Sequence, residues 1–234
     1  MISQQGIEVA WKQRVDHQGF AVIRDFISTG EIAGLLQDTR EPLPRSRAGL
    51  RHALRYPSIA AFVRKPRLTA LAAEILGTAA TPFRATLFNK SPGSNWLVVW
   101  HQDTALPIQH RLDVPGWGSW SVKDGITYAH APAAALEKIV ALRVHLDDST
   151  AENGPLRVLP GTHDLGVLED DAIRQLATDV APVDCVVPLG GVIAMKPLVI
   201  HASSKSRCEQ PRRVLHIEYA PSLDIQDGLT LAVA

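Results

Sequence analysis

The part of the chain after Pro82 constrains the fold most strongly, because it consists of short β-rich runs separated by proline and glycine. These runs are "FRATLFNK", "NWLVVWHQD", "KIVALRVHLDD", "LRVLPG", "DCVVPLGGVIAMK", "LVIHASS" and "RRVLHIEYA". Their length and spacing, with hairpin signals such as "ENGPL" and "LGG", are typical of a sandwich or jelly roll. We therefore expect a mainly β protein with flanking helices.

The segment before this β-rich part is expected to be mainly helical, with one strand in "GFAVIRDFI". Ser28 followed by Glu31 forms a capping box, which predicts that a helix starts at Ser28. A second helix, "RLTALAAEILG", should end at Gly77. The irregular basic segment from Arg45 to Arg55 lies between them, either as a solvated loop or as a lid that meets an acidic substrate.

We expect one domain, since a chain of 234 residues suits a single core. Its parts are a mainly helical region over residues 1–80, a jelly-roll core over 81–221 and a tail over 222–234. The long connection from about Leu106 to Leu136 has too little periodicity for a regular element, and long ordered loops are often functional. The apolar tail "LTLAVA" must pack on its own barrel or on a partner.

Composition excludes several classes of function. Twenty-four basic residues balance 24 acidic ones, which argues against binding to nucleic acid or an anionic membrane and favours a small-molecule partner. Cys185 and Cys208 lack CxxC spacing, so neither a disulfide framework nor a thiolate zinc site is expected, and a cytoplasmic location fits. We find no secretion signal and no apolar run of about 18 residues. Oligomeric state cannot be inferred from these features.

The stretch "VVWHQDTALP" places a histidine and an acid two residues apart at the end of an apolar run. In a strand, His101 and Asp103 share one face and Gln102 points away. This pair alone does not establish a metal site, because a lone strand histidine is more often a satisfied core residue. His201 closes another apolar run, "PLVIHASS", and would complete the two-histidine, one-carboxylate triad of non-haem Fe(II) oxygenases.

A downstream arginine strengthens this interpretation. Arg212 lies in "QPRRVLHIEYA", on the strand that follows His201. A guanidinium binds a carboxylate bidentately, as a clamp on the far end of an iron-bound 2-oxoglutarate would require. Arg213 should face the opposite side and lie at the surface, although strand phase can slip by one residue.

Several ordered motifs together resemble the phytanoyl-CoA dioxygenase family of Fe(II)/2-oxoglutarate oxygenases. They are "LFNKSPGSNWLVVWHQDTALP", "LDDSTAENGPLRVLPGTH", "GGVIAMKPLVIHASS" and "PRRVLHIEYA". The resemblance implies a double-stranded β-helix, with Fe(II) held by His101, Asp103 and His201 and with dioxygen as a further co-substrate. It also implies that Arg212 and Ser203 bind 2-oxoglutarate. The presence of Asp103 favours hydroxylation, because related halogenases lack this carboxylate.

Two residues near the expected co-substrate site are ambiguous. Arg84 stands where ectoine hydroxylase-like members place a glutamine, so it could contact 2-oxoglutarate, the substrate or neither. Lys90 aligns with a family lysine and is either a co-substrate contact or a solvent-facing cap of its strand. Gly190 and Gly191 replace the family's usual Gly-Asp turn, which should affect turn geometry only.

The substrate site is the least determined part. Arg143 and His145 share a strand face and either bind a polar or anionic substrate or form an outer-face pair in water. Trp117 and Trp120, in "PGWGSWSVKDG", are candidates for a substrate wall, and Thr104 follows the ligand pair. We expect a small polar or acidic substrate, without being able to distinguish hydroxylation from desaturation or ring formation.

Two other classes remain as alternatives. A redox-inert cupin-like isomerase or hydrolase could use the same barrel, but cupins favour more histidines and have no use for Arg212. A binding or sensor protein with a degenerate site is disfavoured by the intact ligand triad.

Overall fold

The computed structural model describes residues 4–38, 49–226 and 228–234. Arg45 and Arg47 of the basic segment lie outside the described residues. Within the described part, none of the helices combines the length and the apolar character needed to cross a lipid bilayer.

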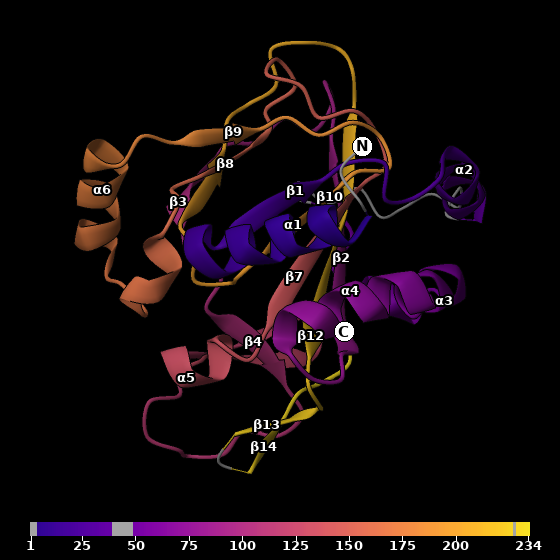
Figure 1. The fold of residues 1–234 in the computed structure, drawn as a ribbon. Helices are drawn as coiled ribbons and strands as arrows, with labels where there is room; N and C mark the ends of the chain where they lie inside the picture. The colour runs from indigo at the N-terminus through magenta and orange to yellow at the C-terminus, as the bar shows by residue number, and fades with distance from the viewer. Residues whose placement is uncertain (1–3, 39–48, 227) are drawn as a thin grey trace.

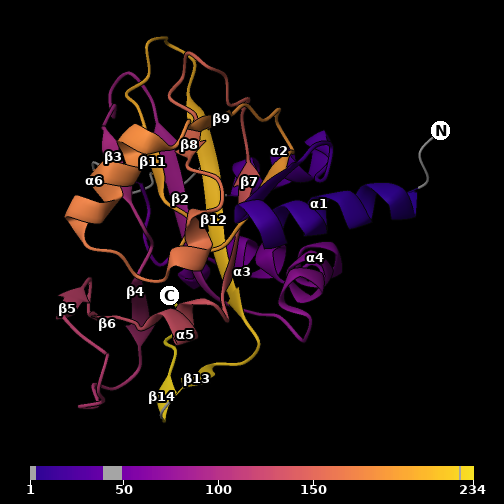
Figure 2. The ribbon, with the colours of Figure 1, turned by 60° about the vertical axis from the view of Figure 1, so that its left-hand side comes forward.

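Two antiparallel sheets form the core, and they confirm the expected jelly-roll fold (Figures 1 and 2). The larger sheet has the order β1 (Phe20–Ile23), β10 (Val192–Met195), β7 (Val140–His145), β12 (Arg212–Ala220) and β2 (Thr81–Lys90). The smaller sheet has the order β3 (Val98–His101), β11 (His201–Ser203), β8 (Leu156–Val158) and β9 (Val183–Cys185).

The helices of the N-terminal part lie along one face of the larger sheet, on the side away from β3 and β8 (Figure 2). They are α1 (Gln4–Gln18), α2 (Thr29–Asp38), η1 (Ala53–Arg55), α3 (Pro57–Val63) and α4 (Pro66–Leu76). The odd-numbered Leu215, Ile217 and Tyr219 of β12 join the apolar cluster under these helices. Because side chains alternate along a strand, the even-numbered residues of β12 face the opposite way, into the barrel.

The long connection between Leu106 and Leu136 contains regular structure, so the expectation of an irregular loop is wrong. The strands β4 (Ala105–Ile108), β6 (Ile126–His130) and β5 (Trp120–Lys123) form a third sheet in that order, and α5 (Ala133–Leu136) follows. Each strand is too short to give a clear sequence pattern, and the three are stabilised by pairing with one another.

The remaining elements lie outside the two core sheets. After β8 come η2 (Thr162–Leu165) and α6 (Asp170–Asp179), and the chain ends with β13 (Asp224–Gln226) and β14 (Leu229–Thr230). The apolar tail packs on its own chain. Leu231 bridges to Ile108, and the backbone of Ala234 bonds to Phe83 and Ala85 of β2.

The capping box predicted at the start of α2 is confirmed. Glu31 donates its backbone N–H to Ser28 Oγ at 3.3 Å, and the Glu31 carboxylate accepts the Ser28 N–H at 3.2 Å. At the end of α4, Gly77 adopts the left-handed conformation with φ 70°, as a glycine C-cap requires.

Replacing Ser28 by alanine is expected to lower the free energy of unfolding by about 1 kcal/mol, because a helix N–H loses its acceptor. Urea unfolding followed by circular dichroism measures this change. Ser28→Asp should retain most of the stability, since aspartate also caps helices. Equal stability of Ser28→Ala and the wild type would show that the cap contributes nothing.

Candidate metal centre

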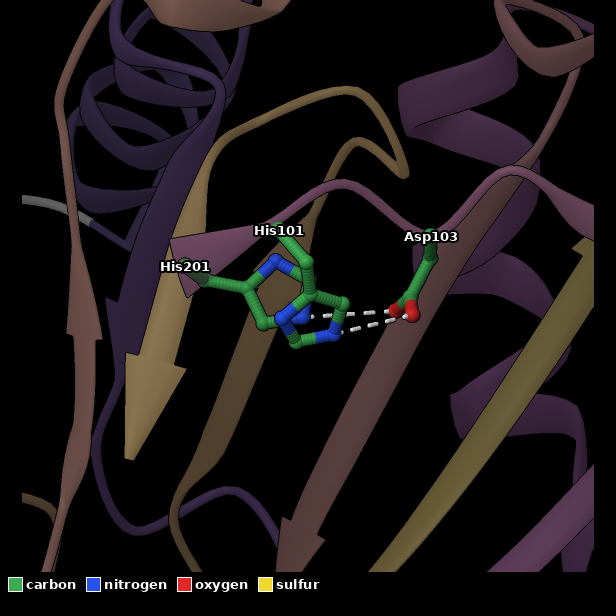
Figure 3. A group of neighbouring side chains, drawn as sticks. All are labelled: His101, Asp103 and His201. Carbon is green, nitrogen blue, oxygen red and sulfur yellow. Dashed lines mark ion pairs between the residues drawn. The ribbon is translucent and has the colours of Figure 1, made fainter. Parts of the chain in front are cut away.

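The structure brings His101, Asp103 and His201 together at one point of the barrel (Figure 3). β3 and β11 are neighbours, and His101 lies directly opposite His201 in their register. Asp103 follows the end of β3, and its carboxylate oxygens lie 3.5 Å from His101 Nε2 and 3.4 Å from His201 Nε2. One ligand atom from each residue lies within 4.8 Å of the others.

The backbone fixes the orientation of both imidazoles. Nδ1 of His101 lies 2.8 Å from the carbonyl oxygen of Val99, and Nδ1 of His201 lies 2.9 Å from that of Val199. A carbonyl can only accept, so Nδ1 carries a proton in each ring, and Nε2 is the nitrogen left for a metal ion. Metal-binding histidines typically have this arrangement, so the residues fit a divalent metal ion.

Gln102 points away from the ligands, as strand alternation predicts, and anchors their segment. Its side-chain amide donates to the carbonyls of Gly166 (2.8 Å) and Leu198 (2.7 Å) and accepts the N–H of Leu168 (2.9 Å). The backbone N–H of Asp103 also donates to the carbonyl of Pro197, at 3.0 Å. The two segments that carry the triad are therefore tied to each other.

The protonation states suit a metal site. Burial alone would raise the pKa of Asp103, but the imidazoles of His201 and His101 hold that pKa well below its usual range. Burial lowers the pKa of His201. The cluster therefore offers an ionised carboxylate and a neutral buried imidazole, the forms that bind metals.

A group of polar side chains surrounds Ser203, two residues beyond His201. Arg212 Nη2 donates to Ser203 Oγ at 3.2 Å, and Lys90 Nζ donates to the same oxygen at 2.8 Å. Lys90 is 1% exposed, so the solvent-facing alternative for this residue is wrong. Burial, with Arg212 and Arg143 nearby, lowers the pKa of Lys90 to about 7.

Three arginines were considered for binding 2-oxoglutarate, Arg84, Arg212 and Arg213, and they have different surroundings. Arg213 points away from the metal centre and forms a two-point ion pair with Asp147 at 2.8 and 2.6 Å. Arg84 lines the cavity, but its guanidinium is paired with Glu218 and donates to the carbonyl of Ala105. Arg212 has no acidic partner among the described residues, and it donates only to Ser203 Oγ and to the carbonyl of Asn153. Of these three arginines, Arg212 is the one whose guanidinium is available to a carboxylate ligand.

A cavity of about 310 Å³ joins the metal centre to the surface. The triad, Ser203 and Arg212 are among the residues that line it. The other residues that line it are Arg51, Arg84, Thr86, Phe88, Trp96, Val98, Lys123, Tyr128, Arg143, Leu156, Ala202 and His216.

Arg143 and His145 both lie inside the barrel, so the outer-face alternative for this pair is wrong. Arg143 lines the cavity, whereas His145 is fully buried behind it and neither of its ring nitrogens has a hydrogen-bond partner. Burial, together with Arg143 and Arg212, lowers the pKa of His145 to about 3. His145 is therefore neutral, and it is not among the residues that line the cavity.

The two tryptophans expected to form a substrate wall do not line the cavity. Trp117 is buried in the apolar cluster around the third sheet, and Trp120 packs against that cluster. Thr104 is also outside the lining and lies 2.7 Å from His130 Nδ1. The tryptophan that lines the cavity is Trp96. The sequence contained no signal for it, because Trp96 precedes β3 and has the parity of Gln102, which points away from the metal centre.

Tyr128 and His216 are further cavity residues that the sequence did not indicate. Tyr128 belongs to β6, within the connection that showed no strand pattern. His216 lies opposite Arg143 in the register of β12 and β7, and this pairing is not visible in the sequence.

A jelly roll that presents two histidines and one carboxylate at the mouth of its barrel defines the class of non-haem iron oxygenases. The family model for phytanoyl-CoA dioxygenase (PhyH) matches residues 15–214, and the chain belongs to this family. Family membership, with the His–Asp–His cluster, confirms the expected iron and 2-oxoglutarate cofactors. It also disfavours the redox-inert cupin-like alternative.

Comparison with known proteins gives relatives that differ in reaction. The chain is 31% identical over 188 residues to L-proline trans-4-hydroxylase of Streptomyces griseoviridis; the match covers 68% of this chain and 62% of that protein. AviO1 from Streptomyces viridochromogenes Tue57 has a similar fold, with TM-score 0.67, 21% identity and coverage of 94% and 96% of the two chains.

A third similar structure is the epimerase SnoN in complex with Fe3+, alpha ketoglutarate and nogalamycin RO. Its TM-score is 0.69 at 17% identity, and 94% of this chain and 86% of that chain are covered. Likeness at this level of identity extends to the fold, so the reaction of the present chain has to be argued from its own residues.

Proposed function

We propose that this protein is a hydroxylase that depends on Fe(II) and 2-oxoglutarate, with iron held by His101, Asp103 and His201. The observation that carries the proposal is the convergence of two Nε2 atoms and one ionised carboxylate, with each imidazole fixed through Nδ1. Three protein ligands on one side leave the other coordination positions open, as oxygen chemistry requires.

The protein's own residues bind and orient the co-substrate. Arg212 and Ser203 are proposed to hold the carboxylate of 2-oxoglutarate farthest from the metal, and Lys90 orients the Ser203 hydroxyl. A guanidinium donating two parallel bonds fixes the plane of that carboxylate. When bound, iron would supply oxidising chemistry in which dioxygen converts 2-oxoglutarate to succinate and carbon dioxide and provides the oxygen atom for the substrate.

The other cavity residues are proposed to exclude water and to place the substrate. Trp96 and Phe88 give the cavity apolar walls, and Tyr128 adds an amphipathic one. A small polar or acidic substrate fits a cavity of about 310 Å³ with these walls and several cations. Hydroxylation is the favoured outcome because Asp103 is present and because L-proline trans-4-hydroxylase is a relative.

The test starts from purified protein without oxygen. Adding Fe(II) and 2-oxoglutarate should give the weak visible charge-transfer band of this complex, and admitting oxygen should give succinate. Mass spectrometry after incubation with small amino acids, L-proline first, then looks for products that have gained one oxygen atom. Absence of both the band and succinate would exclude an oxygenase, whereas a product of unchanged mass would point to epimerisation.

The affinity for 2-oxoglutarate is expected to weaken as pH rises above about 7, the pKa of Lys90. Below this pH the ammonium favours the dianionic ligand. Above it, binding requires uptake of a proton, so the Kd increases by up to about tenfold per pH unit. Titration of the visible band with 2-oxoglutarate between pH 6.5 and about pH 9 measures this dependence.

Two variants separate Lys90 from other titrating groups. Lys90→Met should show a nearly pH-independent Kd, while Lys205→Met, at an exposed lysine two residues beyond Ser203, should behave as the wild type. A pH dependence that persists unchanged in Lys90→Met would assign it to another group.

A further inference from the structure

Arg143 is a buried cation that no acidic residue among those described pairs with. It is 7% exposed and lines the cavity that contains the metal centre. Nη1 lies 3.1 Å from His216 Nδ1, the guanidinium stacks near the ring of Phe88 at 5.4 Å, and Nε has no hydrogen-bond partner. A guanidinium can only donate, so Nδ1 of His216 accepts and this imidazole is neutral.

A buried charge without a counter-ion is costly, which makes this arrangement informative. Arg84 and Arg213 are balanced by Glu218 and Asp147. Arg212 lacks an acidic partner, but the far carboxylate of 2-oxoglutarate accounts for it under the proposed function. For Arg143, neither an acidic residue among those described nor the carboxylate of 2-oxoglutarate held by Arg212 supplies such a partner.

The charges of the loaded site lead to the same conclusion. Asp103 offsets one of the two positive charges of Fe(II), and the two negative charges of 2-oxoglutarate offset the other and Arg212. Arg143 then remains uncompensated, with Lys90 adding a further partial positive charge near neutral pH. At the cavity lining, the exposed cations Arg51 and Lys123 favour the approach of an anion.

The position of Arg143 separates it from the 2-oxoglutarate clamp. It lies on β7 opposite His216 of β12, whereas Arg212 lies at the start of β12 opposite Lys90 of β2. Ser203 bonds to Arg212 and Lys90, and Arg143 shares none of these hydrogen bonds.

We propose that Arg143 is the anion-binding residue of the substrate site and that the substrate carries a carboxylate, which the free edge of this guanidinium binds. This inference rests on the proposed function, which it deepens by naming the substrate class. A carboxylate placed there would remove the uncompensated buried charge and would fix the substrate at one end within the cavity that holds the metal ligands.

Acetate and acetamide are matched probes for this site, because they have nearly the same shape and differ in charge. Each is titrated by calorimetry into oxygen-free protein loaded with Fe(II) and 2-oxoglutarate, at equal ionic strength. Formation of the visible band first shows that the loaded complex exists, so a failure of the proposed function is recognised before the probes are added. Acetate should bind saturably with one equivalent, and acetamide should not.

Three variants assign the binding. Arg143→Gln should weaken acetate binding by at least about tenfold, and Arg143→Lys should recover part of it. Arg157→Gln is the control, because it removes a positive charge from β8, where Arg157 pairs with Asp184. This variant should bind acetate as the wild type does. Circular dichroism and thermal melting establish that each variant is folded.

Several results would overturn the proposal. One is that acetate does not bind saturably to the loaded wild type, and another is that acetate and acetamide bind equally well. A third is undiminished acetate binding in folded Arg143→Gln, because acetate would then be bound to the metal. The Kd for 2-oxoglutarate, taken from the band, should change less than about threefold in Arg143→Gln. A loss as large as that in an Arg212 variant would instead assign Arg143 to the co-substrate.

Discussion

Replacing Asp103 by alanine is expected to abolish iron binding and to reduce succinate formation by at least about a hundredfold. Asp103 supplies the one carboxylate of the triad, and the adjacent imidazoles keep it ionised against the effect of burial. Two neutral imidazoles remain in the variant, and they cannot offset the charge of a divalent ion. Iron content after gel filtration and the rate of succinate release measure the two effects.

Asp113→Ala is the matched control, because Asp113 is exposed in the segment between β4 and β5 and takes no part in the cluster. It should retain iron and activity. Thermal melting distinguishes ligand loss from misfolding, since the Nδ1 bonds of His101 and His201 do not depend on the carboxylate. An Asp103→Ala protein with full iron content would exclude this residue as a ligand.

Replacing Arg212 by glutamine is expected to raise the Kd for 2-oxoglutarate by about a hundredfold while iron binding is retained. The glutamine amide keeps a donor near Ser203 but loses the charge and the two-point geometry. Titration of the visible band gives the Kd. At high 2-oxoglutarate the band should return in this variant, whereas in Asp103→Ala it should not.

Arg213→Gln tests which of the two adjacent arginines of β12 points into the barrel. Arg213 is adjacent in sequence but points outward to Asp147, so its loss should lower stability slightly and leave the Kd for 2-oxoglutarate near the wild-type value. If Arg213→Gln weakened co-substrate binding and Arg212→Gln did not, the register of β12 would be shifted by one residue.

Strand alternation was sufficient to predict much of the metal centre. An apolar run that ends in His101 places Asp103 on the same side, and the opposite direction of Gln102 follows from the same rule. The closeness of His201 depends on β3 pairing with β11, which is a long-range contact. Before the structure, this connection rested on the apolar run that ends in His201, on the expected jelly roll and on the resemblance to a known family.

The alternation of side chains along a strand does not show which of its two faces points into the barrel. Arg143 and His145 occupy the same face, and their polarity suggested that it could lie in water. The apolar face of β7, with Val140, Leu142 and Val144, is covered by the helices of the N-terminal part. The polar face is therefore the one that lines the barrel.

The third sheet was missed for a different reason. β4, β5 and β6 are short, and β4 contains a proline, so their local preference for extended structure is weak. They are stabilised by one another and by the C-terminal tail, which bridges to β4 through Leu231. The prediction that Trp117 and Trp120 form a substrate wall assumed an irregular loop in this segment, and it was wrong because the segment forms a sheet.

The hydrogen bonds of Gln102 have a consequence for how the protein acquires its metal. This side chain joins the carbonyls of Gly166 and Leu198 and the N–H of Leu168, and so holds the ligand segment without help from an ion. Folding and metal uptake can then be separate events. A molecule that has lost its iron should remain a competent acceptor, ready to be reactivated by fresh Fe(II) without passing through an unfolded state.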